Sequence, residues 1–149
     1  MLDRSAIGKK SQKKGKTGQE LFAQWCRSHG FDYESCRRKD GDGLPRLHVE
    51  VKFYKSREGL DIDKSFEQSI IDAERWSKET GKREIPILAW RVNYQRGWNI
   101  VMRTVDLIEL YTGEPCRREL FSKVQMEGEE WMGVYKKRME AKGEKTIRS

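Results

Sequence analysis

The stretch LHVEVKFY, residues 47–54, decides how the chain folds, because its apolar and polar residues alternate. Successive side chains of a β-strand point to opposite faces, so the pattern predicts a strand over 46–55 with one apolar face. The other face holds His48, Glu50, Lys52 and Tyr54. Two interpretations of that face remain open. It could simply turn to water, as in many antiparallel sheets. Alternatively, it lines a cleft in which Glu50 binds a metal ion and Lys52 stabilises developing negative charge.

The patterns on either side of this strand predict alternating helices and strands. Upstream, an apolar stripe predicts a helix from Gly18 to His29, and alternation predicts a strand over 31–36. Downstream, we expect a helix over 64–81, strands over 84–92 and 97–103, a short helix or turn over 104–111 and a last helix over 127–142. The segment 84–92 is continuously apolar, which is typical of a strand that is buried on both faces.

This order of elements predicts one α/β domain in which helices flank a central mixed five-stranded sheet. A chain of 149 residues is long enough for a single core of that kind. We expect a basic flexible arm over 1–14, the folded core over 15–125, and a C-terminal helix with a basic tail over 126–149.

The basic residues are concentrated at the two ends of a chain whose net charge is +7. The N-terminal set consists of Arg4, Lys9, Lys10, Lys13, Lys14 and Lys16. Such arms suit contact with a phosphate backbone, where they release counterions. They could equally be solvated ends that aid solubility, so charge alone leaves a nucleic-acid partner open.

The three cysteines and the hydropathy pattern exclude several other classes. Cys26, Cys36 and Cys116 are odd in number and lack the spacing of a zinc site, so neither a disulfide framework nor a structural zinc is expected. No apolar run approaches the length of a membrane span or a signal sequence. We therefore expect a cytoplasmic protein without a membrane partner.

Several acids could join Glu50. Asp40 lies ten residues before it, across a turn that contains Gly43 and Pro45, and a hairpin would bring the two carboxylates together. Mg²⁺ is commonly held by one or two carboxylates. However, Asp40 and Asp42 are also ordinary turn residues. Glu20 follows Thr17 by three residues, which a capping box explains without any metal.

Three further polar residues are candidates for contact with DNA. His48 shares a face with Glu50, Gln68 comes early in the predicted helix 64–81, and Arg91 precedes a polar turn. Each also has a plain structural interpretation: an uninvolved polar residue, a solvated helix face, and a cation at the rim of a buried Trp98.

The pattern D-x-x-G-L-P-x-x-H-x-E-x-K, from Asp40 to Lys52, resembles the active-site hairpin of the PD-(D/E)XK nuclease superfamily. It is most similar to the Holliday junction resolvase-like branch of archaea and bacteriophages. The upstream stretch KGKTGQELFAQWCRSHGF, residues 14–31, resembles the first helix of that branch. The similarity covers about residues 14–103 and leaves both tails outside.

The resemblance implies a restriction-endonuclease-like core and a metal-dependent endonuclease that resolves four-way DNA junctions. It implies that Mg²⁺ or Mn²⁺ is bound by Glu20, Asp40, Glu50 and the backbone carbonyl of Val51. Lys52 would be the catalytic lysine and Gln68 an accessory group at the scissile phosphate. It further implies a homodimer and, as a hypothesis, a bacteriophage origin, hence the host cytoplasm.

Two departures from the family pattern keep the second aspartate open. Lys39 replaces a proline, and Asp42 stands where an apolar residue is usual, although the spacing to GLP favours Asp40. Two other functions also remain open: a nuclease of this superfamily that acts on DNA ends, flaps or mismatches, and a noncatalytic DNA-binding module.

Overall fold

The structure, a computed structural model, describes residues 17–34, 43–56, 58, 60–93 and 95–143. A first helix spans 17–28. The elements that follow are β1 (Leu47–Tyr54), α2 (Ile62–Thr80), β2 (Ile85–Val92), β3 (Asn99–Arg103), α3 (Thr104–Thr112), β4 (Lys123–Glu127) and α4 (Gly128–Ala141). None of the described helices is both long and apolar enough to cross a membrane.

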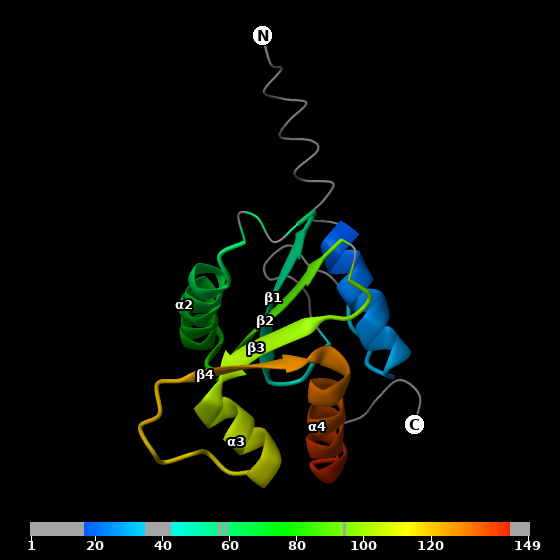
Figure 1. Ribbon diagram of the computed structural model, residues 1–149. Coiled ribbons are helices and arrows are strands. Elements are labelled where there is room, and N and C mark those ends of the chain that lie inside the picture. The colour runs from blue at the N-terminus through cyan, green and yellow to red at the C-terminus, as the bar shows by residue number, and fades with distance from the viewer. Residues whose placement is uncertain (1–16, 35–42, 57, 59, 94, 144–149) are drawn as a thin grey trace.

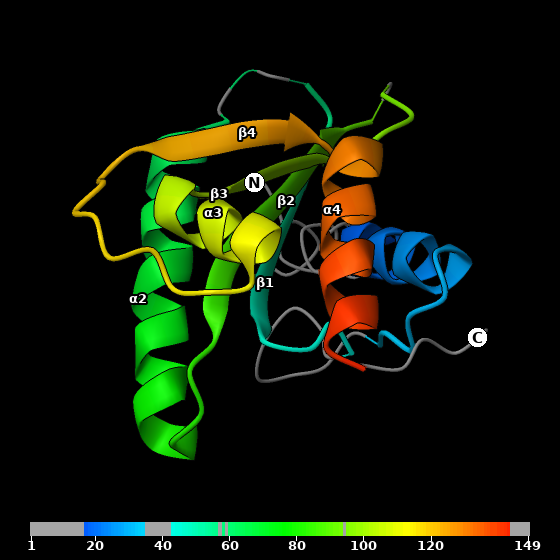
Figure 2. The ribbon, with the colours of Figure 1, turned by 90° about the horizontal axis from the view of Figure 1, so that it is seen from below.

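The four strands form one mixed sheet in the order β1-β2-β3-β4 (Figure 1). β1 and β2 are parallel, with α2 as the crossover between them, whereas β3 and β4 are added antiparallel. α2 covers one face of the sheet, and the first helix, α3 and α4 lie against the other (Figure 2). The protein is thus a single α/β domain with helices on both faces of the sheet.

β2 is the strand around which both layers pack. Ile85, Ile87 and Ala89 enter the larger core with the first helix and α4. Leu88, Trp90 and Val92 point the other way and pack with Phe66 of α2. The prediction that this strand is buried on both faces is confirmed.

The prediction of five strands is wrong in two respects. Residues 31–34 form no strand, since Glu34 makes only an isolated bridge, and residues 35 and 36 lie outside the described segments. Conversely, β4 was not expected at all. Only two of its five residues are apolar, so its pairing with β3 rather than its composition defines it.

The predicted division between 125 and 126 falls inside β4, and α4 belongs to the core. Trp131, Met132, Tyr135 and Met139 of α4 are all buried against the sheet. Cys26 is buried among the same residues, and burial raises the pKa of its thiol. It is therefore an unreactive packing residue, as the sequence suggested.

Phe22 of the first helix joins this helix to the rest of the larger core. Its ring meets those of Tyr33 and Trp98 edge to face, with centroids 5.3 and 5.2 Å away, and lies 5.6 Å from Trp25. Edge-to-face pairs of this kind add stability beyond the buried area. The first helix, which precedes the sheet in sequence, is thereby fixed to the loop before β3.

We expect Phe22→Ala to lower the free energy of unfolding by about 3–5 kcal/mol, because it opens a cavity in a fully buried aromatic cluster. Urea unfolding followed by circular dichroism measures the change. Ile71→Ala is the matched control, because Ile71 is 52% exposed on α2. Equal losses of unfolding free energy in the two variants would mean that the aromatic cluster is not the main contact that holds the first helix to the core.

Candidate active site

Glu50 and Lys52 lie side by side on the face of β1 that turns toward α2. Their carboxylate and ammonium groups form an ion pair, with Lys52 Nζ 3.2 Å from Glu50 Oε1. The Glu50 side chain is 18% exposed and that of Lys52 38% exposed. Their partners in β2 are Leu88 and Trp90, which are buried. The pair therefore lies where buried apolar side chains meet solvent, so water screens its charges only in part.

The backbone of β1 adds a carbonyl to the outer side of this pair. The amides of Ile85 and Asn93 donate to the carbonyls of Arg46 and Tyr54, so the even-numbered residues of β1 bond to β2. Backbone groups alternate in direction along a strand, so the carbonyl of Val51 points away from β2.

Asp40 and Asp42, the predicted partners of Glu50, lie outside the described residues. The residues that flank their segment are close together, because Gly43 packs on the backbone of Asp32 and Tyr33. A side chain at 43 would collide with that backbone, and the φ of +123° also favours glycine. The backbone conformation and the close packing at this position therefore explain the glycine of the GLP motif without any role in catalysis.

Glu20 pairs with an arginine of its own helix. Its carboxylate accepts a hydrogen bond of 2.8 Å from Arg27 on the exposed side of the first helix. The first helix packs on the face of the sheet opposite to Glu50, through Phe22 and Ala23. Within the described ranges, no group of three His, Cys, Asp or Glu side chains is arranged to hold a metal ion.

His48 is buried rather than part of an open polar face, since it is only 4% exposed. Its Nδ1 lies 3.1 Å from Glu84 Oε2, and its ring is close to that of Trp76. A buried imidazole offers no surface to a phosphate. The sequence could not show that His48 is buried and Glu50 partly exposed, because both residues lie on the same face of β1. The difference arises because α2 covers His48 more completely than Glu50.

The other two predicted DNA contacts occupy different surroundings. Gln68 is exposed on α2 and donates a hydrogen bond of 3.0 Å to Asp72. The guanidinium of Arg91 lies between the rings of Phe53 and Trp98, about equally far from each at 5.9 and 5.8 Å. Such stacking is a cation–π contact. It matches the interpretation of Arg91 as the rim of a buried Trp98.

The most buried acids of the described chain serve another purpose. Asp106 and Glu109 of α3 are 1% and 4% exposed and are neutralised by arginines. Arg83 contacts both acids, and Arg103 donates to Asp106 over 2.7 Å. The hydrogen bond to Glu109 raises the pKa of Arg83. This cluster fixes α3 to the sheet, and its acids are fully occupied by cations.

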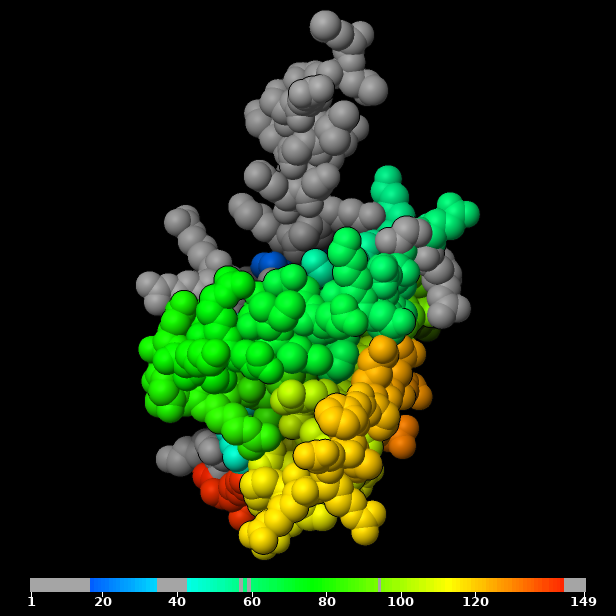
Figure 3. Space-filling view, turned by 90° about the vertical axis from the view of Figure 1, so that its left-hand side faces the viewer, coloured from blue at the N-terminus to red at the C-terminus, as the bar shows by residue number. Residues whose placement is uncertain are grey.

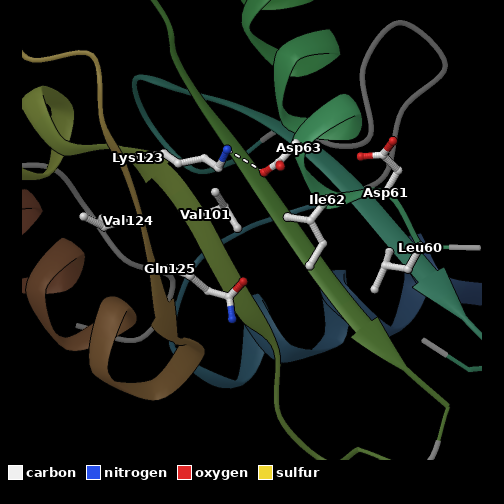
Figure 4. A pocket seen from close by; sticks show the side chains of 8 residues that line it. All are labelled: Leu60, Asp61, Ile62, Asp63, Val101, Lys123, Val124 and Gln125. Atoms are coloured by element: carbon white, nitrogen blue, oxygen red, sulfur yellow. Dashed lines mark ion pairs between the residues drawn. The ribbon is translucent and has the colours of Figure 1, made fainter. Parts of the chain in front are cut away.

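A separate cavity of about 680 Å³ lies between the start of α2 and β4 (Figure 4). Ile62 and Val101 give it an apolar wall, and Lys123 spans it to pair with Asp63 at 2.5 Å. Glu50 and Lys52 are not among the residues that line it.

No family model matches the sequence, and no curated protein matches it significantly. Among solved structures, the chain is similar to Hjc, a Holliday junction resolvase from the archaeal hyperthermophile Archaeoglobus fulgidus. The similarity covers 80% of this chain and 96% of that one, with 16% identity and a TM-score of 0.44.

We expect His48→Ala to lower the free energy of unfolding by about 1–3 kcal/mol, because it removes a buried hydrogen bond and the ring beside Trp76. Affinity for DNA should stay within about twofold of the original. Urea unfolding and a fluorescence binding titration measure the two effects, with Glu67→Ala on the exposed side of α2 as control. Lost affinity with unchanged stability would restore His48 as a phosphate contact.

Proposed function

We propose that the protein is a metal-dependent DNA endonuclease that resolves four-way junctions. The observation that carries this proposal is the Glu50–Lys52 pair, 3.2 Å apart in the partly exposed second half of a strand whose first three residues are buried. Placing two charges beside an apolar core has a free-energy cost that a purely structural strand avoids. The pair also occupies the E-x-K positions of the motif that resembles junction resolvases.

In this proposal, Glu50 is one ligand of a Mg²⁺ or Mn²⁺ ion. A carboxylate that is accessible yet held in place by a neighbour suits such a hard cation, and the outward carbonyl of Val51 is a second oxygen donor. Asp40 is assigned as the next ligand, because it holds the aspartate position of the motif that resembles junction resolvases. Glu20 would join them only by leaving Arg27.

When bound, the metal polarises the phosphodiester and lowers the pKa of a water molecule. The other roles belong to the chain itself. The ion pair with Glu50 fixes the ammonium of Lys52 on the reactive face. From there, Lys52 donates hydrogen bonds to the attacking water or to the oxygens on which negative charge develops. Gln68 is proposed to contact the scissile phosphate from α2.

The basic residues would hold the DNA. Lys9, Lys10, Lys13, Lys14 and Lys16 belong to the N-terminal arm, outside the described residues, and are proposed to follow the phosphate backbone. Arg91 has its cation stacked between two rings, so it is assigned a secondary role in this contact. As in the resolvases that the sequence resembles, two copies of the chain would cut opposed strands.

Two alternatives use the same residues differently. A nuclease of the same superfamily could act on DNA ends, flaps or mismatches, and a noncatalytic module could bind DNA without cutting. The Glu50–Lys52 ion pair favours catalysis over mere binding, because a carboxylate facing a phosphate weakens binding unless a cation lies between them. The choice of DNA shape rests on the motif alone.

We expect Glu50→Ala and Lys52→Ala each to reduce cleavage of a four-way junction at least about a hundredfold, because each removes a group that acts on the reacting phosphate. Binding should change much less. The assay compares labelled four-way junction, flap and linear duplex with Mg²⁺ or with EDTA, and Glu67→Ala is the control.

Three results of this assay would overturn the proposal. Paired nicks in flap but not in junction would assign the first alternative, and tight binding without any cut would assign the second. Normal cleavage by either variant would show that the site is elsewhere.

The two aspartates are separated by Asp40→Asn and Asp42→Asn. We expect only Asp40→Asn to abolish cleavage and to weaken Mn²⁺ binding at least about tenfold in isothermal titration calorimetry, because only one carboxylate need share the cation with Glu50. The reverse ranking would assign Asp42 as the ligand, while equal and small effects would mean that neither binds the metal.

A further inference from the structure

The outer edge of β4 is unpaired in the part of the chain that the structure describes, because β4 is the last strand of the sheet. At its two ends, the amide of Thr104 donates to Ser122 and that of Gly128 to Trp98. The even-numbered residues of β4 therefore bond to β3. Since backbone groups alternate along an antiparallel ladder, Lys123, Gln125 and Glu127 point their amides and carbonyls outward.

The sequence of this strand, KVQME, is complementary to itself when it is read in the opposite direction. An antiparallel copy centred on Gln125 places Lys123 opposite Glu127 of the second copy, and Val124 opposite Met126. Opposite charges in directly facing positions stabilise a pair of strands, and Lys123, which pairs with Asp63 yet stays 43% exposed, would then lie between two carboxylates. In this register the outward-pointing residues face one another, so about six backbone hydrogen bonds can form across the axis.

We propose that a second copy of the chain pairs with this edge, antiparallel and about a two-fold axis at Gln125. Charges on an edge strand usually prevent pairing with other sheets. Here they permit only the register that joins Lys123 to Glu127, so the edge selects its own copy. The two four-stranded sheets become one continuous sheet.

An exposed aromatic side chain beside the same edge supports this partner. Phe121, two residues before β4, is 94% exposed, and Leu120 next to it is 36% exposed. In Figure 3 the segment between α3 and β4, coloured yellow to orange, projects beside α2. Pairing across β4 brings a second chain to this place and covers apolar surface that a monomer leaves in water.

The pairing has a consequence for the proposed active sites. A two-fold axis perpendicular to the sheet leaves both α2-covered faces on the same side. The two Glu50–Lys52 pairs then lie on one side of the assembly, seven strand spacings apart, or about 34 Å. The inference deepens the proposed function by supplying a geometry for two cuts in one substrate, but the pairing itself does not rest on that function.

The test is the molar mass of the full-length protein without DNA or metal, by light scattering and sedimentation velocity. A dimer is expected at micromolar concentration. Glu127→Lys should weaken dimerisation at least about tenfold, because it places lysine opposite Lys123 of the other copy at both ends of the paired strands. Lys123→Glu combined with Glu127→Lys should restore the dimer. Glu130→Lys, the same charge change one helical turn further into α4, should have little effect.

A second variant tests the backbone hydrogen bonds. Glu127 has a φ of −62° and no side-chain cap hydrogen bond, so proline fits there and removes only an outward amide. Glu127→Pro should yield a folded monomer, as judged by circular dichroism. A monomeric original protein, a dimer insensitive to Glu127→Lys and Glu127→Pro, or a double variant that stays monomeric would each overturn the proposed pairing. All three can be distinguished from loss of nuclease activity, because no DNA is present.

Discussion

The parallel pairing of β1 with β2 is the constraint on which the rest of the structure depends. A parallel pair needs a crossover, and α2 supplies it by packing Phe66 and Ala73 on one face of the sheet. The other face of the same pair then requires its own cover, which the first helix and α4 provide. Because β2 is apolar on both sides, neither layer can be removed without exposing it to water.

This arrangement also decides where charge can be placed. Among the four described strands β1 comes first in the sheet, and α2 covers it unevenly: His48 is buried with Glu84, while Glu50 and Lys52 keep partial access to solvent. At the other end, β4 exposes Lys123, Gln125 and Glu127. The proposed chemistry and the proposed self-association thus occupy the two opposite edges of one sheet, and neither competes with the other for surface.

The most buried charges illustrate a different use of the same physics. Asp106 and Glu109 would be costly to bury as isolated carboxylates, and Arg83 and Arg103 compensate them by direct hydrogen bonds. That cluster is structural, since each acid is already bound to a guanidinium. The less buried pair on β1 is the better candidate for catalysis, because its carboxylate remains accessible to another cation.

The sequence by itself determined the elements whose hydropathy pattern is strong. It predicted β1, α2, β2, β3 and α4 close to their observed bounds, because period and burial agree along each of them. It also predicted that Glu50 and Lys52 share a face. Only the tertiary structure decided that β4 is a strand, that α4 is part of the core, and that His48 is buried while Glu50 is not. These outcomes depend on which neighbour covers a residue, and a local pattern of side chains contains no information about distant neighbours.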